Sequence, residues 1–80
     1  MKITYDPEAN AAYISVLDPI PDGAATTQIH SIMTPGDRGE IILDFDTDGH
    51  LLGVEILQAN QVLPPSVLAT ASTIGPTGTP

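Results

Sequence analysis

The chain of 80 residues provides material for one small domain. Ten acidic side chains against two basic ones, Lys2 and Arg38, give a net charge of −8. This charge excludes an ordinary nucleic-acid-binding surface, which needs basic side chains against phosphates, and argues against charge-held binding to anionic lipid. The chain has no cysteine, no apolar run long enough to span a bilayer and no signal-peptide pattern after Met1, so we expect a cytoplasmic protein.

Large apolar side chains are scarce. The aromatic residues are Tyr5, Tyr13 and Phe45, and tryptophan is absent. A domain of this length buries only about 60–65 % of the surface that its unfolded chain exposes. Without a disulfide or an evident structural metal, oligomerisation is the usual remaining source of stability. We therefore expect a homo-oligomer, with a dimer favoured.

The first half of the chain predicts short strands between strong turn signals. Residues 2–6 and 11–17 alternate apolar and polar side chains and predict a hairpin. Two prolines within 18–23 exclude a central strand there. Residues 25–32 are β-prone but polar, which favours an edge strand, and residues 34–39 predict a loop.

A second hairpin is predicted between residues 40–46 and 50–57, around Asp48-Gly49. A two-residue Asp-Gly loop suits the positive φ angles of a type I′ turn. The register that follows places three apolar pairs on one face: Phe45 with Leu52, Leu43 with Val54, and Ile41 with Ile56. On the other face it sets Asp46 beside Leu51, Asp44 beside Gly53, and Ile42 beside Glu55. A slip by one residue would disrupt the apolar face, so pattern and turn agree.

The strand-like alternation of apolar and polar side chains ends after Leu57. Residues 58–63 predict one helical turn that ends before two prolines, and Ser66 is a candidate cap for a second turn over 67–71. From Ser72 the composition indicates a flexible tail. The predicted fold is therefore mainly β (α+β), an antiparallel meander of four to five strands with a short C-terminal helix. We expect a β-rich domain over 1–63 and a Pro/Gly/Thr-rich extension over 64–80.

One pattern matches the EF-hand calcium loop. It consists of Asp44, Asp46, Asp48-Gly49 and, after five residues, Glu55. A true EF-hand requires flanking helices, whereas both flanks here have strand periodicity. We therefore expect no dedicated metal site and no cofactor, with Asp44, Asp46 and Glu55 as candidates for weak calcium binding only.

Catalytic patterns are not found in the sequence. His30 and His50 lack metal-ligand spacing, and the serines lie in no nucleophile motif. The expectation is a protein that is not an enzyme but a self-associating protein-interaction module. The candidate interface residues are Tyr5, Tyr13, Phe45, Leu52 and Val54, and the acidic residues Asp44, Asp46 and Glu55 are expected on an outer face.

Two signatures together resemble the small bacterial family called Domain of Unknown Function 2283. The first covers residues 1–14 and includes Tyr5-Asp6-Pro7 and Tyr13-Ile14; the second covers residues 42–59 and includes Asp48-Gly49. The chain departs from the family where Asn10 replaces an expected aspartate and Phe45 a common tyrosine, among other positions.

The resemblance implies a compact β-rich domain and carries over no catalytic residue. Because such proteins are sometimes encoded beside small toxin-like proteins, it also implies an alternative function, an antitoxin-like inhibitor of a small basic toxin. Electrostatic complementarity would suit an acidic chain and a basic partner. A weak calcium-binding protein is the further alternative.

Overall fold

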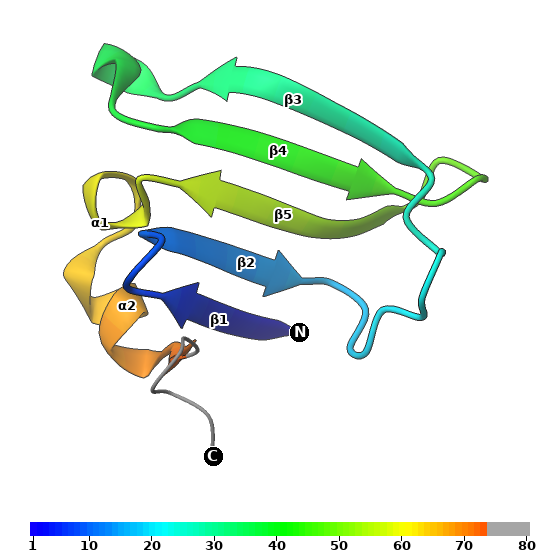
Figure 1. Cartoon of the computed structure of the whole chain (residues 1–80), viewed down its shortest axis with the longest axis horizontal. Coiled ribbons are helices and arrows are strands. Elements are labelled where there is room, and N and C mark those ends of the chain that lie inside the picture. The colour runs from blue at the N-terminus through cyan, green and yellow to red at the C-terminus, as the bar shows by residue number, and fades with distance from the viewer. Residues whose placement is uncertain (74–80) are drawn as a thin grey trace.

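Six strands form one sheet in the order β3-β4-β5-β2-β1-β6 in the computed structural model, which describes residues 1–73 (Figure 1). The strands are β1 (Lys2–Asp6), β2 (Ala11–Ser15), β3 (Thr27–Met33), β4 (Glu40–Phe45), β5 (Leu51–Leu57) and β6 (Ser72–Thr73). A 3-10 turn η1 (Pro35–Asp37) joins β3 to β4, and two short helices, α1 (Ala59–Val62) and α2 (Pro65–Thr70), follow β5. The mainly β fold class is confirmed.

The strand order is more than a simple meander. The β3-β4-β5 meander is extended by the β1-β2 hairpin, because β2 pairs with β5 rather than with β3. All of these pairs are antiparallel, and the short β6 adds to β1 in parallel. The long open edge of the sheet is β3, as expected for the polar strand predicted at residues 25–32.

The strand registers align apolar side chains in two rows that cross five strands on one face of the sheet. The helix-side row consists of Ile32, Ile41, Ile56, Ala12 and Tyr5. The second row, here called the open row, consists of Ile29, Leu43, Val54, Ile14 and Ile3. Because side chains alternate between faces, the residues between these rows form a polar face on the opposite side.

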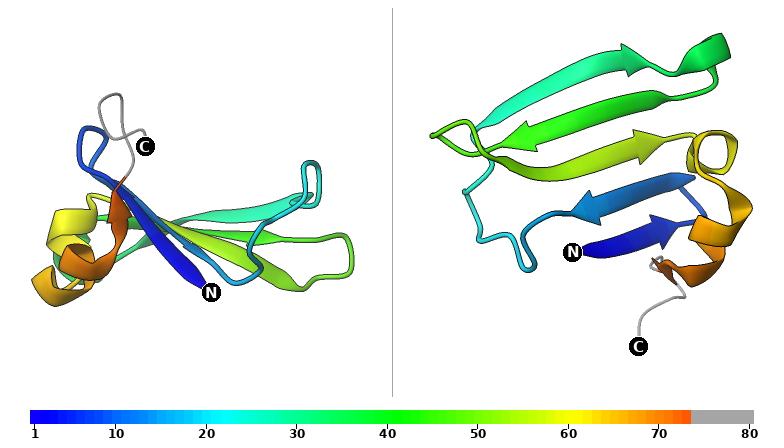
Figure 2. Two further views of the ribbon diagram at one scale, coloured as in Figure 1. Left: turned by 90° about the horizontal axis from the view of Figure 1, so that it is seen from below. Right: turned by 180° about the vertical axis from the view of Figure 1, so that it is seen from behind.

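The two helices cover only one end of the apolar face (Figure 2). Ala12, Ile56 and Ala59 form the buried cluster, with Val62, Leu63 and Leu68 of the helical segment packed against it. Leu52 of β5 is also buried, at 5 % exposure. No member of the open row is buried. The buried cluster therefore lies under the helices, at the end of the sheet where β5 finishes, whereas Leu52 is buried near the start of β5.

A β-bulge in β3 explains how Ile29 and Ile32, three residues apart, reach the same face. Ile29 pairs with Leu43 and Ile32 with Ile41, so two residues of β3 face one residue of β4. Ser31 lies in this bulge with φ 66°, and its backbone N–H donates to Glu40 Oε2 at 2.9 Å. The extra residue restores the alternation that places both isoleucines on the apolar face.

The predicted register of the β4-β5 hairpin is confirmed over most of its length. Ile41 pairs with Ile56, Ile42 with Glu55, Leu43 with Val54 and Asp44 with Gly53. The predicted pairs of Phe45 with Leu52 and of Asp46 with Leu51 are wrong, since Phe45 pairs with Leu51. The register shifts by one residue at this point, which makes β5 one residue longer than β4 on the turn side.

The turn type explains the shift. Gly49 N–H donates to the Asp46 carbonyl at 3.0 Å, and Asp46 N–H donates to the His50 carbonyl at 2.9 Å. Gly49 has φ 84°, whereas Asp48 does not have a positive φ. The predicted two-residue type I′ turn is therefore wrong. The loop has three residues, with the hydrogen bonding of a type I turn followed by a left-handed glycine.

Beyond β5 the helical turns form where the sequence predicts them, but their ends differ. Pro64 precedes α2 in the capping position and no side chain caps the helix, so the cap predicted for Ser66 is wrong. Ser72 and Thr73, predicted as the start of a tail, pair with Thr4 and Tyr5 in β6. The rest of the predicted tail, residues 74–80, lies outside the described residues. Within residues 1–73, neither helix has the length and apolar character needed to cross a bilayer.

Truncating the buried Ile56 to alanine should destabilise the fold far more than the same change at Ile42. Ile56 is 3 % exposed beneath the helices, whereas Ile42 is half-buried on the polar face of the neighbouring strand. Ile56→Ala is expected to lower the free energy of unfolding by about 2–5 kcal/mol through lost burial and a residual cavity. Urea denaturation of both variants measures this, and equal losses would contradict a core centred on the cluster beneath the helices.

Candidate functional site

A tyrosine crosses the polar face to reach an aspartate two strands away. Tyr13 of β2 donates its hydroxyl to Asp44 Oδ2 of β4 at 2.8 Å, over the intervening strand β5. Gln28 of β3 donates its side-chain amide to the other carboxylate oxygen, Oδ1, at 2.9 Å. One carboxylate thus links β2, β4 and β3.

Gly53 makes this crossing possible. It pairs with Asp44 on β4 and with Ser15 on β2, and it is buried beneath the tyrosine. A Cβ atom at this position would overlap the ring and the hydroxyl of Tyr13. The glycine in the middle of β5 therefore serves a close approach, because an aromatic side chain occupies the space that its own side chain would need.

This environment alters the ionisation of the tyrosine. Desolvation by burial, followed by the hydrogen bond to Asp44 and the negative charges of Asp44 and Glu55, raises the pKa of Tyr13 to about 12. Each of these effects disfavours the phenolate, which would be a second negative charge against the aspartate. The neutral hydroxyl is therefore held as a hydrogen-bond donor.

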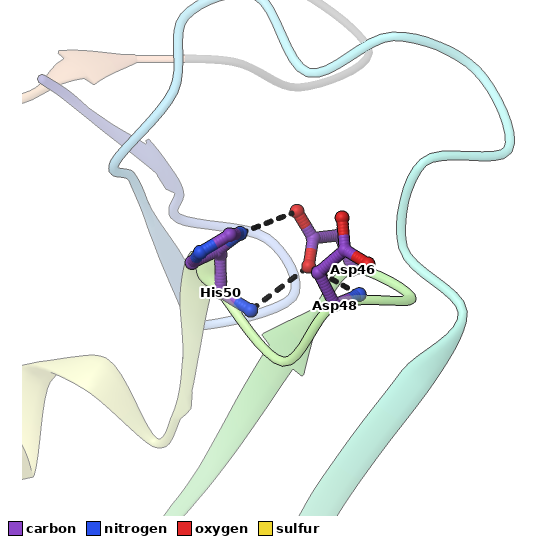
Figure 3. A group of neighbouring side chains, drawn as sticks. All are labelled: Asp46, Asp48 and His50. Atoms are coloured by element: carbon purple, nitrogen blue, oxygen red, sulfur yellow. Dashed lines mark hydrogen bonds and ion pairs between the residues drawn. The ribbon is translucent and has the colours of Figure 1, made fainter.

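The β4-β5 turn carries the second polar group (Figure 3). Asp46 Oδ1 accepts the backbone N–H groups of Asp48 at 2.9 Å and of His50 at 2.8 Å, and its Oδ2 lies 3.3 Å from His50 Nδ1. The pKa of Asp46 is lowered, first by the backbone hydrogen bond from His50. Desolvation opposes this effect, and the His50 side chain and the Asp48 N–H lower the pKa further. The carboxylate thus stabilises the turn by local hydrogen bonds.

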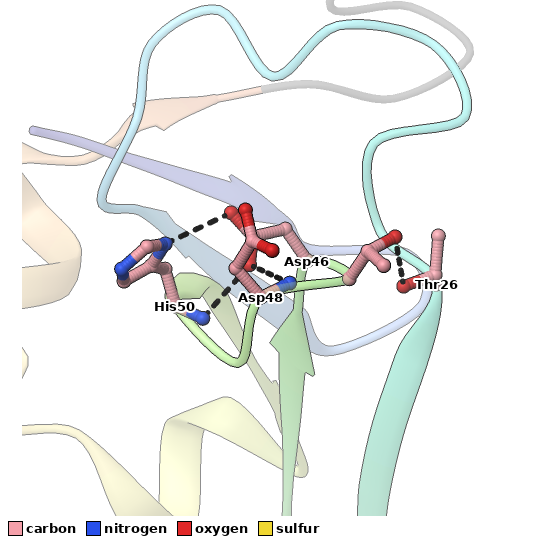
Figure 4. Close-up of polar contacts among 5 residues, drawn as sticks. Thr26, Asp46, Asp48 and His50 are labelled. Atoms are coloured by element: carbon pink, nitrogen blue, oxygen red, sulfur yellow. Dashed lines mark hydrogen bonds and ion pairs between the residues drawn. The ribbon is translucent and has the colours of Figure 1, made fainter.

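The same turn is connected to the loop that precedes β3. The hydroxyl oxygens of Thr26 and Thr47 are 3.3 Å apart, so one donates to the other (Figure 4). The Thr26 N–H also donates to the Phe45 carbonyl at 3.0 Å. These bonds hold the long β2-β3 connection against the hairpin turn.

The structure groups a different set of potential metal ligands from the one predicted. Ligand atoms of Asp46, Asp48 and His50 lie within 4.8 Å of one another on the turn. The predicted candidates Asp44, Asp46 and Glu55 are not grouped among the described residues, because Asp44 bonds to Tyr13 and Glu55 stands opposite Ile42. Strands flank the turn on both sides, so the structure of an EF-hand is excluded.

Asn10 connects the β1-β2 turn to α1, a role that the sequence analysis missed. In the left-handed region at φ 53°, it accepts the Asn60 N–H on Oδ1 at 3.0 Å and the Ala59 N–H on its carbonyl at 2.9 Å. Its side-chain N–H₂ donates to Gln58 and Asn60, and the Tyr5 hydroxyl donates to Oδ1 at 3.2 Å. An asparagine suited to a left-handed turn was the available signal, but its distant partner was not visible in the sequence.

The five candidate interface residues fall in different environments. Tyr5 and Val54 are half-buried beside the core cluster, and Leu52 is buried. Phe45 is half-buried next to the hairpin turn, and Tyr13 lies on the opposite, polar face. The structure thus gathers Tyr5, Phe45, Leu52 and Val54 on or beside the apolar face and separates Tyr13 from them.

Comparisons with known proteins give one match. The model of a family described as a protein of unknown function, DUF2283, matches residues 2–60. This range covers both predicted hairpins and the start of α1. Neither the curated proteins nor the solved structures contain a match to the chain.

Adding one methyl group at Gly53 should disrupt the polar face. We expect Gly53→Ala to lower the free energy of unfolding by about 1–3 kcal/mol, because the tyrosine must leave its position over β5. In a Tyr13→Ala background the same change should cost much less, since the obstructing ring is gone. Urea denaturation of the four proteins forms a double-mutant cycle. Additive effects would show that Tyr13 and Gly53 are not coupled.

The raised pKa of Tyr13 predicts a loss of stability at alkaline pH. The folded state holds the phenolic proton more tightly than the unfolded state, whose tyrosine titrates near its ordinary value of 10. The contribution is therefore complete below pH 10 and is lost as the pH rises toward 12. The wild type should lose more stability over this range than Tyr13→Phe, measured by urea denaturation at each pH. Parallel pH profiles for the two proteins would contradict the prediction.

Proposed function

This chain belongs to the DUF2283 family, described as a protein of unknown function, and we propose that it is a non-enzymatic protein-interaction module that associates with itself. The observation that carries the proposal is the incomplete core. Among residues 1–73, the buried apolar side chains are Ala12, Leu52, Ile56 and Ala59. Two of these four are alanines, so little large side-chain surface is removed from water.

A sheet with an apolar face normally buries that face against a second layer. Here the second layer consists of two short helices at one end, and the sheet extends well beyond them (Figure 2). Association of two copies would supply the missing layer without a partner of any other kind. This is the usual route to stability for a small domain with no disulfide.

The polar groups support a structural rather than a catalytic role. Both oxygens of Asp44 accept hydrogen bonds, from Tyr13 and Gln28. Asp46 accepts two backbone N–H groups and contacts His50. A general base must be within reach of a substrate proton, whereas these carboxylates are engaged in holding strands and a turn together.

Sedimentation equilibrium of the full chain tests the proposal. We expect a species of twice the 8.3 kDa chain mass at micromolar to hundred-micromolar concentration. Raising the salt concentration should strengthen association, because two copies of net charge −8 repel each other and salt screens that repulsion. A monomer throughout this concentration range, at both low and high salt, would contradict self-association.

A further inference from the structure

We propose that the open row is the self-association interface, on which the open row of a second copy packs face to face to form a two-layer sandwich. This inference rests on the proposed function and specifies its surface and its partner. The row is defined by Ile29, Leu43, Val54, Ile14 and Ile3, one residue from each of five neighbouring strands.

The two apolar rows differ in what covers them. In the helix-side row, Ala12 and Ile56 are 2 % and 3 % exposed beneath the helical segment, and the other three residues are half-buried. The open row crosses the same five strands farther from the helices; four of its residues are only half-buried, and Ile29 is 48 % exposed. The row nevertheless consists entirely of Ile, Leu and Val. Ile14 and Val54 of this row pack against the buried cluster, but no member of the row is fully covered by its own chain. An apolar row that is only partly covered has the character of an interface core.

Charge favours a second copy on this face and opposes one on the other face. The open row carries no polar side chain, whereas the residues beside it on β4 and β5 place Asp44 and Glu55 on the polar face. Two polar faces of the same chain would bring like charges together, which is destabilising. Two open rows meet without that penalty, so identical copies are complementary through this face.

The size of the sheet suits such an interface. A stable protein interface buries about 800 Å² on each partner. The molecule measures 35 × 33 Å in its two larger dimensions and 20 Å in the third. The outline of the molecule across its two larger dimensions exceeds this area, and sheets in a sandwich pack about 10 Å apart. A twofold arrangement also uses the same patch on both copies, as symmetric dimers do.

Two matched substitutions on β3 test the interface. Ile29 lies in the open row, and Met33, on the same strand and 53 % exposed, pairs with Glu40 on the polar face. Ile29→Lys and Met33→Lys change the net charge equally, and both replace side chains that are about half exposed in one copy. We expect Ile29→Lys to raise the dimer dissociation constant about tenfold or more, and Met33→Lys to leave it within about twofold.

Sedimentation equilibrium of the wild type and both variants separates the possible results, with circular dichroism melting curves to confirm that each variant folds. A monomeric wild type would refute the proposed function itself. If the wild type is a dimer, loss of affinity in Ile29→Lys alone supports the open row. Equal losses in both variants would point to pairing through the β3 edge, and a loss in Met33→Lys alone would point to the polar face. Either of these results, or unchanged affinity in both variants, would overturn the inference while leaving self-association intact.

Discussion

The pairing of β5 on both of its sides is the constraint on which the rest of the structure depends. β5 joins the β3-β4-β5 meander to the β1-β2 hairpin, and its alternation assigns every neighbouring side chain to one of two faces. Val54 and Ile56 point to the apolar face, where they align with residues of four other strands. A one-residue slip of β5 would move each of its side chains to the opposite face, and both apolar rows would be interrupted at this strand.

The two faces of β5 are stabilised in different ways. On the polar face, the missing side chain of Gly53 allows Tyr13 to reach Asp44, so strands that are not neighbours become linked. On the apolar face, Ile56 is sealed by the helical segment while Val54 remains half-buried. The chain thus stabilises one face with its own hydrogen bonds and covers the other face only in part.

Local patterns predicted most of the local structure. Alternation and turn chemistry located β1 to β5 and most of the β4-β5 register, because these signals are close in sequence. The turn type was mistaken because the Asp46 carboxylate, by accepting two backbone N–H groups, favours a three-residue loop that the Asp48-Gly49 pair alone does not reveal. The pairing of β2 with β5, the partner of Tyr13 and the connection from Asn10 to α1 join distant segments, and no short-range pattern specifies such contacts.

The parallel pairing of β6 with β1 places Ser72 and Thr73 along Thr4 and Tyr5, so nearly the whole described chain separates the two partners. A ribosome releases β1 first and β6 last, with all of the remaining strands in between. During synthesis the two hairpins and the β2-β5 pair can therefore form well before β1 gains β6 as its second neighbour. The nascent chain therefore carries one side of β1 as an unpaired sheet edge until Ser72 and Thr73 emerge, so the β1-β6 pair is the last of the strand pairs that can form.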